Sequence, residues 1–296
     1  MRVFLTGSTG FIGSHVAHAL IAAGHQVLGM TRSQPGAEAL RALGIEPHHG
    51  TLEDLASLKR GAEQCDAVIH TAFDHDFAHF VDNCEKDARA IAALGEALHG
   101  SQRPLLITSG TPMGSPAPGE PADEDHFNPA HPNPRAASER AGEALLQGGL
   151  NVVVMRLSQI HDTVKQGLVT ELIKHAQQTG ISAYVDDGLN RWSAAHVSDT
   201  AQLYRLALET HQPGARYHAT AESSIPFRLI AETLGAGLGL PVMSVSADEA
   251  MARFGWLSAF AGRDMSSNSS KTTARLGWTL AGPGLMADLQ GFFDHR

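Results

Sequence analysis

The sequence predicts an α/β fold, with a doubly wound parallel sheet followed by a smaller C-terminal α/β lobe. Over the first 156 residues, short apolar runs of strand length alternate with longer segments of helical spacing. A glycine-rich turn separates the first strand from the first helix, and the alternation loosens after Arg156. Strands that alternate with helices are typical of βαβ units around a parallel sheet.

The elements follow from the apolar pattern and from the residues that end each segment. The predicted strands are Arg2–Thr6, Gln26–Met30, Ile45–Pro47, Ala67–His70, Pro104–Thr108, Asn151–Arg156, Arg216–Ala219 and Pro241–Val245. The predicted helices are Phe11–Ala23, Gly36–Leu43, Leu52–Arg60, Phe77–Leu98, Ala136–Leu146, Leu168–Gln178, Asp199–Leu208, Ile225–Leu238 and Gly282–Phe293. Gly24 and Gly44 follow the first two helices, where glycine commonly ends a helix.

The segment Gly110–Pro134 is rich in proline and interrupts the alternation. It predicts a long loop without regular structure inside a packed domain. Such loops are commonly lids or binding loops, although a passive surface excursion is an equal alternative.

Composition excludes several classes of protein. The chain has 22 basic and 31 acidic residues and a net charge of −9, which argues against nucleic acid or an acidic membrane as a partner. The sequence contains no run of about 18 apolar residues, so it predicts no membrane span. The two cysteines, Cys65 and Cys84, form neither a disulfide framework nor metal-ligand spacing, so we expect buried thiols and no metal site. The first apolar stretch is a strand rather than a signal peptide, so the expected location is cytoplasmic.

The strongest local motif is Thr6-Gly7-Ser8-Thr9-Gly10-Phe11-Ile12-Gly13, between a predicted strand and a predicted helix. Gly7 permits the tight turn, Gly10 lets the backbone approach a pyrophosphate, and Gly13 lets the helix pack closely on the strand. The amide groups and the dipole at the helix N-terminus attract the anion. This position and context predict a Rossmann-type dinucleotide site.

The residues after the second strand favour NADP over NAD. Thr31-Arg32-Ser33 follows that strand, and no acidic residue occurs before Glu38. An acidic residue there would bind the ribose 2′-hydroxyl of NAD, whereas Arg32 can pair with a 2′-phosphate and Ser33 can add a hydroxyl. The alternative is that Arg32 is a solvated surface residue.

The glycine spacing resembles the extended short-chain dehydrogenase/reductase superfamily, often labelled NAD-dependent epimerase/dehydratase. Matching stretches include Gly50–Asp54, Ala67–Ala72, Arg156–Ser158, Gly188–Trp192, His196–Asp199 and Leu276–Trp278. The resemblance implies a Rossmann domain at 1–160, which also receives about 190–218, and a mainly substrate-binding, discontinuous lobe at 161–296. It also implies cofactor contacts at Gly7, Thr9, Gly10, Phe11, Ile12, Gly13, Arg32, Ser33, Leu52, Thr71, Ala72, Phe73, Thr108 and Leu157.

The sequence departs from that superfamily at the active site. The usual pair is a Tyr and a Lys four residues later, and here Arg135 and Glu139 stand at those positions. No Tyr-x-x-x-Lys occurs anywhere in the chain. The superfamily's Ser or Thr aligns with Gly110, although Ser109 or Thr111 could substitute from an adjacent position.

These departures resemble the atypical short-chain dehydrogenases, and most of all atypical subgroup 7. The stretches that match the subgroup are Ala72–Phe77, Thr108–Gly110 and Asn190–Trp192. The resemblance implies the fold and the cofactor more firmly than a reaction.

Four residues are candidates to replace the missing proton donor. His75 follows the fourth strand, Ser109 and Thr111 the fifth, and His161 the sixth, at the edge of the sheet where ligands bind. A histidine beside a carboxylate can act as an acid near neutral pH. For each, a loop or capping role is the alternative, and Asp74 could cap the helix that starts near Phe77.

Two hypotheses from different classes follow. The chain is an NADP(H)-dependent oxidoreductase acting on a small organic carbonyl, imine or activated alkene, or it is a non-catalytic NADP(H)-binding redox sensor or regulatory protein. The predicted substrate lobe favours the enzyme. A nucleotide-sugar epimerase or dehydratase is less favoured, because those reactions rely on the missing Tyr. A homodimer through the helix of Arg135 and Glu139 is possible, and so is a solvated or salt-bridged face there.

Overall fold

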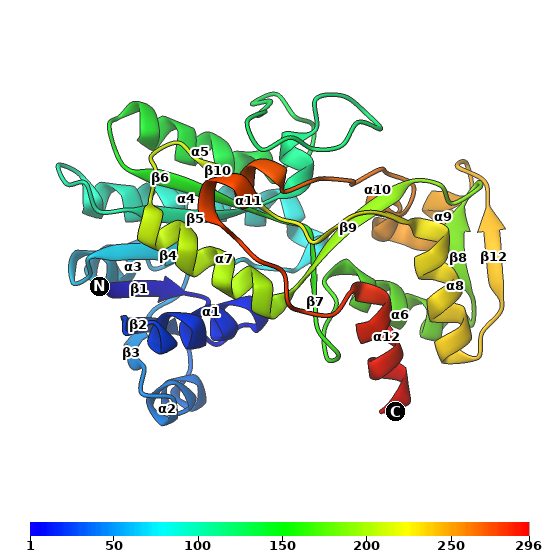
Figure 1. The fold of residues 1–296 in the computed structure, drawn as a ribbon, viewed down its shortest axis with the longest axis horizontal. Coiled ribbons are helices and arrows are strands. Elements are labelled where there is room, and N and C mark those ends of the chain that lie inside the picture. The colour runs from blue at the N-terminus through cyan, green and yellow to red at the C-terminus, as the bar shows by residue number, and fades with distance from the viewer. Residues whose placement is uncertain (296) are drawn as a thin grey trace.

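The computed structural model describes residues 1–295, which form a larger part around one parallel sheet and a second lobe with its own apolar core (Figure 1). The large sheet has the order β10-β6-β5-β4-β1-β2-β3, and its strands pair in parallel. Its strands are β1 (Arg2–Thr6), β2 (Gln26–Thr31), β3 (Glu46–His49), β4 (Ala67–His70), β5 (Leu105–Gly110), β6 (Val152–Leu157) and β10 (Arg216–Ala219). The order reverses between β1 and β4, so their carboxyl ends flank the usual ligand site of such sheets.

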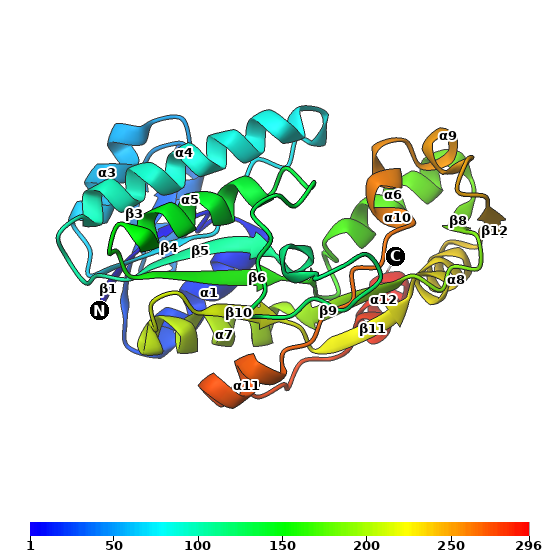
Figure 2. The same ribbon diagram turned by 90° about the horizontal axis from the view of Figure 1, so that it is seen from above.

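Helices cover both faces of this sheet (Figure 2). One face carries α3 (Leu55–Glu63), α4 (Phe80–Leu98) and α5 (Ala136–Gln147), and the other carries α1 (Phe11–Ala22) and α7 (Val197–Thr210). The helix α2 (Gln34–Ala42) links β2 to β3 and adds Leu40 to the core on the α1 side. This doubly wound arrangement is the fold that the sequence predicts.

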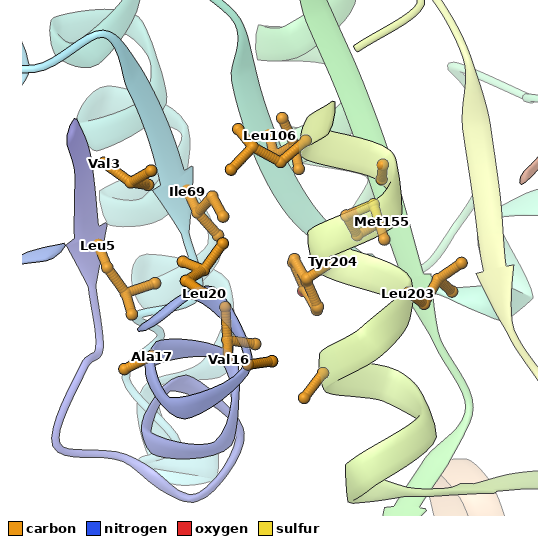
Figure 3. Packing of buried hydrophobic residues seen from close by; sticks show 14 of the residues in the cluster. Val3, Leu5, Val16, Ala17, Leu20, Ile69, Leu106, Met155, Leu203 and Tyr204 are labelled. Atoms are coloured by element: carbon orange, nitrogen blue, oxygen red, sulfur yellow. The ribbon is translucent and has the colours of Figure 1, made fainter. Parts of the chain in front are cut away.

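Alternate strand residues point to opposite faces of the sheet and divide its core in two. Leu5, Ile69 and Leu106 pack against α1 and α7, where Leu20 and Tyr204 meet them (Figure 3). Neighbouring strand residues such as Phe4 and Val68 instead join the core under α3, α4 and α5. Cys65 and Cys84 are buried and free, as predicted.

The second lobe is built on two small sheets. One has the order β11-β9-β7 and the other pairs β12 with β8. Its strands are β7 (Gln159–His161), β8 (Ser182–Val185), β9 (Arg191–His196), β11 (Glu222–Pro226) and β12 (Val242–Val245). Its helices are α6 (Leu168–Thr179), α8 (Phe227–Leu238), α9 (Ala250–Phe254), α10 (Ser258–Ala261) and α12 (Leu285–Asp294), with the short turn η3 (Gly255–Leu257).

Several predicted elements need correction. The sequence missed β7, β8, β9 and β11, and Ile225, predicted as helical, belongs to strand β11. Asp76 rather than Asp74 caps the turn η1 (Phe77–His79), by accepting the N–H of Ala78 at 3.0 Å. Asp74 pairs with Lys86 at 2.8 Å instead. Among residues 1–295, no helix is both long and apolar enough to cross a membrane.

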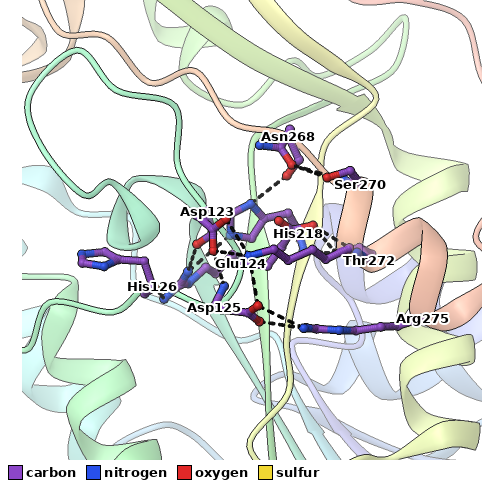
Figure 4. Close-up of polar contacts among 11 residues, drawn as sticks. Asp123, Glu124, Asp125, His126, His218, Asn268, Ser270, Thr272 and Arg275 are labelled. Carbon is purple, nitrogen blue, oxygen red and sulfur yellow. Dashed lines mark hydrogen bonds and ion pairs between the residues drawn. The ribbon is translucent and has the colours of Figure 1, made fainter.

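The proline-rich loop is not structureless, because its centre is tied down (Figure 4). It opens with the turn η2 (Thr111–Gly114), and Ala122 forms a bridge with Ser267. The chain then passes α11 (Ser270–Leu276), where the N–H of Thr272 donates to the fully buried Glu124 at 3.0 Å. Neighbouring carboxylates of the loop pair with Lys271 and Arg275. The contacts of residues 122–125 with residues 267–275 form the anchor of the loop. If the loop acts as a lid, only the parts on either side of this anchor are free to move.

His218 of β10 contacts Thr272, the residue that binds Glu124 of the proline-rich loop. We expect His218 to make the free energy of unfolding depend on pH. Burial and the nearby Arg156 lower the pKa of His218 to about 3, against about 6.5 for an unperturbed histidine. Between these values the unfolded chain binds a proton that the folded chain does not. The free energy of unfolding should therefore fall as the pH drops from about 6.5 toward 3.

We expect His218→Asn to flatten this dependence, measured as the urea midpoint at pH 7 and pH 5. His99→Asn, at the exposed end of α4, is the control. An unchanged pH profile in the His218 variant would contradict the prediction.

Candidate cofactor and active site

The glycine-rich turn is packed tightly on one side and open on the other. Gly7 has a φ of +71°, and a Cβ there would lie 2.7 Å from the Thr71 Oγ1. A Cβ on Gly13 would overlap the carbonyl oxygen of Gly7. A Cβ on Gly10, by contrast, would meet only the Gly7 oxygen, at 3.1 Å. Gly7 and Gly13 are therefore required for packing. The exposed Gly10 leaves room for a ligand to approach the protein backbone.

The same turn exposes the N-terminus of α1. Gly10 is the N-cap, no side chain caps the helix, and its first turn holds no acidic residue. Thr9 and Gly10 are exposed, while Phe11 and Ile12 are partly buried. Uncapped N–H groups and the positive end of the helix dipole suit a phosphate group. The residues present thus fit the diphosphate of a dinucleotide.

Residues after β2 and β3 border this turn. The Ser8 hydroxyl donates to the carbonyl of Met30 at 2.9 Å, which ties the turn to β2. Arg32 is exposed and forms no ion pair within residues 1–295. Ser33 accepts the N–H of Gly36 at 3.2 Å and so caps α2, a role that the sequence interpretation missed. Leu52 and Ala72 both pack against the core that lies under α3, α4 and α5.

The end of β4 lies directly beside the turn. The Thr71 hydroxyl donates to the Thr6 carbonyl at 2.7 Å, and the Ala72 N–H donates to the Thr6 hydroxyl at 3.2 Å. On β5, the Thr108 hydroxyl donates to the His70 carbonyl at 2.6 Å. Leu157 pairs with Gly110 in register at the ends of β6 and β5. The structure therefore brings these predicted contacts to one edge of the sheet.

Arg135, which we expect where the superfamily has its Tyr, forms a largely buried network of hydrogen bonds. Its Nη1 donates to Asp87 at 2.6 Å, and its Nη2 donates to the Thr108 carbonyl at 2.9 Å. The guanidinium lies over the Phe73 ring, 4.1 Å from the ring centroid. Ser138 also donates to Asp87, at 2.6 Å. Arg135 thus joins the start of α5 to α4 and to the cofactor edge.

Asp87 needs these partners because it is fully buried. Burial alone would raise the pKa of Asp87, but the Arg135 charge and hydrogen bonds from His70 and Ser138 outweigh it and hold that pKa well below its usual range. The His70 Nε2 donates to Asp87 at 3.0 Å, and its Nδ1 lies 2.8 Å from the Thr6 hydroxyl. The network therefore reaches the glycine-rich turn itself.

Glu139, which we expect where the superfamily has its Lys, also forms an ion pair, with Arg156. It is buried and accepts two hydrogen bonds from Arg156 of β6, both at 2.8 Å. Arg156 further donates to the carbonyls of Asp123 and His126 in the proline-rich loop. Of the expected alternatives of a salt-bridged or a solvated face, Arg135 and Glu139 therefore show the salt-bridged one.

The predicted proton donors occupy different environments. His75 is exposed, and its ring lies 5.2 Å from the Phe73 ring. Ser109 and Thr111 are buried, and the Ser109 hydroxyl has no hydrogen-bond partner within the described chain. His161 is fully buried, and its Nδ1 lies 2.6 Å from Asp288 of α12. Of the four candidates, only His75 therefore lies at the exposed edge, beside Phe73. A catalytic role for any of the four candidates stays a prediction.

Tyr204 cannot take over from the missing Tyr at this edge. It is fully buried in α7, and its hydroxyl lies 2.6 Å from the Thr108 hydroxyl. Burial raises the pKa of Tyr204, which opposes release of its proton.

Sequence reasoning missed two contacts between the larger part and the second lobe. Lys165, from the turn after β7, lies over Phe11 with its Nζ 5.8 Å from the ring centroid. Trp256 of η3 stacks on Phe77 at a centroid distance of 4.2 Å and an interplanar angle of 12°. Both partners in the larger part belong to segments that follow β1 and β4. The position of Phe11 in the glycine motif was a signal, but nothing in the sequence paired it with Lys165.

Comparison with known proteins shows the family of this chain. The model of the NAD dependent epimerase/dehydratase family matches residues 3–220. The chain belongs to this family. It is accordingly a member of the extended short-chain dehydrogenase/reductase superfamily, while the atypical subgroup stays a prediction.

Relatives cover most of the chain. It is 44% identical to "Uncharacterized protein C2A9.02" of Schizosaccharomyces pombe, over 98% of each chain. It is 30% identical to the 4-hydroxy-2-methyl-3-oxo-4-farnesyl-3,4-dihydroquinoline-1-oxide ketoreductase of Stigmatella aurantiaca, over 79% of this chain and 74% of the other. Among solved structures, the UDP-glucose 4-epimerase of Thermus thermophilus in complex with NAD has a TM-score of 0.76 at 21% identity, covering 100% of this chain and 98% of the other. That likeness supports the fold.

The Arg135–Asp87 pair generates a stability prediction. Arg135→Ala leaves a buried carboxylate without its charged partner, which costs about 3–5 kcal/mol of the free energy of unfolding. We expect Arg135→Ala combined with Asp87→Asn to recover part of that loss, measured by urea unfolding. Arg140→Ala, on the exposed side of α5, is the control. A loss below about 1 kcal/mol in the single variant would contradict a paired role.

Proposed function

We propose that this chain is an NADP(H)-dependent reductase that acts on a carbonyl, imine or activated alkene of a small organic molecule. The observation that carries the proposal is the meeting of Phe73, His75 and Arg135 at the carboxyl end of β4, beside the glycine-rich turn. In a reductase, this edge must hold a group that stabilises the negative charge left on the substrate. The relative of Stigmatella aurantiaca, a ketoreductase by name, supports a reaction of this class.

The proposed cofactor would lie across the glycine-rich turn, with its diphosphate at the N-terminus of α1 and its 2′-phosphate at Arg32. The nicotinamide ring supplies the hydride. Phe73, Thr71 and Ala72 form the wall beside the turn, and Arg135 keeps Phe73 in place from behind. The uncapped helix and the unpaired Arg32 support this placement.

His75 is the proposed donor to the substrate oxygen. Although it is exposed, the surrounding protein removes part of its hydration, and together with the charges of Lys165 and Arg135 this lowers the pKa of His75. The lowered pKa favours the neutral imidazole, whose N–H can polarise a carbonyl. The Arg135 charge adds to stabilisation of the developing alkoxide, and at this exposed edge water supplies the proton that the alkoxide takes up, while the imidazole keeps its N–H.

A second candidate function is an NADP(H)-binding redox sensor. The commitment of both Arg135 and Glu139 to buried ion pairs favours it, since neither residue replaces the usual Tyr or Lys chemically. The two functions are separated by NADPH oxidation measured against a panel of ketones, aldehydes, imines and enones. Turnover supports the reductase, whereas inactivity of a protein with NADPH confirmed bound supports the sensor.

Cofactor preference is tested at Arg32. We expect the native protein to bind NADPH more tightly than NADH, and Arg32→Ala to weaken NADPH binding about tenfold or more while leaving NADH unaffected, because a charged hydrogen bond to the 2′-phosphate is lost. Calorimetric titration measures both affinities. Arg41→Ala, on the exposed end of α2, is the matched control. Equal affinities of the native protein for the two cofactors would remove the argument for NADP.

The donor role is tested at His75. We expect His75→Gln to lower kcat by about 100-fold or more, with the NADPH dissociation constant unchanged. His79→Gln, on the same exposed segment, is the control, and Ser109→Ala, Thr111→Val and His161→Gln are compared with it. A kcat that falls with one of those three and not with His75 would reassign the donor.

A further inference from the structure

Lys165 differs from the other four lysines of the chain. Within the described residues, Lys59, Lys86, Lys174 and Lys271 each form an ion pair with a carboxylate, and Lys165 forms none. The chain has a net charge of −9, so acidic residues outnumber basic residues, and yet none of them pairs with Lys165 within the described residues. A cation without a carboxylate is available to an anionic ligand.

The position of Lys165 indicates which ligand. Its Nζ lies 5.8 Å from the ring centroid of Phe11, the first residue of α1. Its charge also acts on His75, whose pKa it helps to lower. Phe11 follows β1 and His75 follows β4, so Lys165 faces the edge between these two strands. That edge holds the uncapped N-terminus of α1.

The backbone at Lys165 is held by a tight turn, although the side chain is exposed. The carboxylate of Asp162 accepts the N–H groups of Val164 and Lys165, at 2.7 and 2.8 Å. The Asp162 N–H donates to the Lys165 carbonyl at 2.9 Å, and the buried Gln166 donates to the Asp162 carbonyl at 3.0 Å. The ammonium is thus presented from a preorganised backbone, which lowers the entropy cost of binding.

We propose that Lys165 binds the diphosphate of the cofactor from the second lobe, opposite the amide groups at the start of α1. This inference rests on the proposed NADP(H) site. The diphosphate would then be held between two positive groups, a helix N-terminus in the larger part and an ammonium in the second lobe. The second lobe would contribute to cofactor binding as well as to the substrate.

The test compares ligands with and without a diphosphate. We expect Lys165→Met to weaken NADPH binding about tenfold, equivalent to about 1.4 kcal/mol, and to leave adenosine 2′-monophosphate binding unchanged. Arg32→Ala should weaken both ligands, because both carry the 2′-phosphate. Lys165→Arg should restore most of the NADPH affinity. Lys174→Met, an exposed lysine of α6 in the same lobe, is the control.

A second measurement, the titration of His75, tests whether the Lys165 charge lies near His75, and it needs no cofactor. Removal of its charge should raise the NMR-measured pKa of His75 toward its ordinary value, while Asp74 and Arg135, the other charges acting on that ring, are unchanged. Lys174→Met should leave the His75 titration as in the native protein.

The outcomes separate the two proposals. A native protein that does not bind NADPH overturns the proposed function, and this inference with it. If the native protein binds NADPH and Lys165→Met binds it equally well, only the inference fails, whatever the His75 titration gives. Equal weakening of NADPH and adenosine 2′-monophosphate would overturn the assignment to the diphosphate.

Discussion

The buried carboxylate of Asp87 is the constraint on which the candidate site depends. A charge without water must be paired, and here its partners come from two elements: His70 on β4, and Arg135 and Ser138 at the start of α5. His70 extends the network to Thr6, which in turn holds the segment after β4. The start of α5, the end of β4 and the glycine-rich turn are therefore fixed relative to one another by one carboxylate.

A second ion pair, Arg156–Glu139, has the same effect one helical turn later. It is fully buried and also fixes the proline-rich loop through two of that loop's carbonyl groups. Arg135 and Glu139, which the resemblance to the superfamily places where its Tyr and Lys would be, both form buried ion pairs here.

The sequence was sufficient for the elements of the large sheet. The ends of β1 and β4 agree with the apolar runs, because buried parallel strands produce short, continuous apolar segments. The four missed strands lie beyond β6, where runs such as Arg191–His196 mix polar and apolar residues. Local pattern could not place them, since their partners come from distant parts of the chain. The loop anchor at Glu124 and Thr272 was beyond prediction for the same reason.

Within the site, the tight turn of the glycine motif was predictable, because a Cβ at Gly7 or Gly13 would overlap neighbouring atoms. The charges of Arg135 and Glu139 were consistent with either salt bridges or a solvated face, because their partners Asp87 and Arg156 are brought to them only by the fold. The stack of Phe77 on Trp256 has a further consequence. It joins the two parts through apolar ring faces rather than charges, so this contact resists salt and weakens on cooling. Temperature, more than ionic strength, should set how often this contact opens.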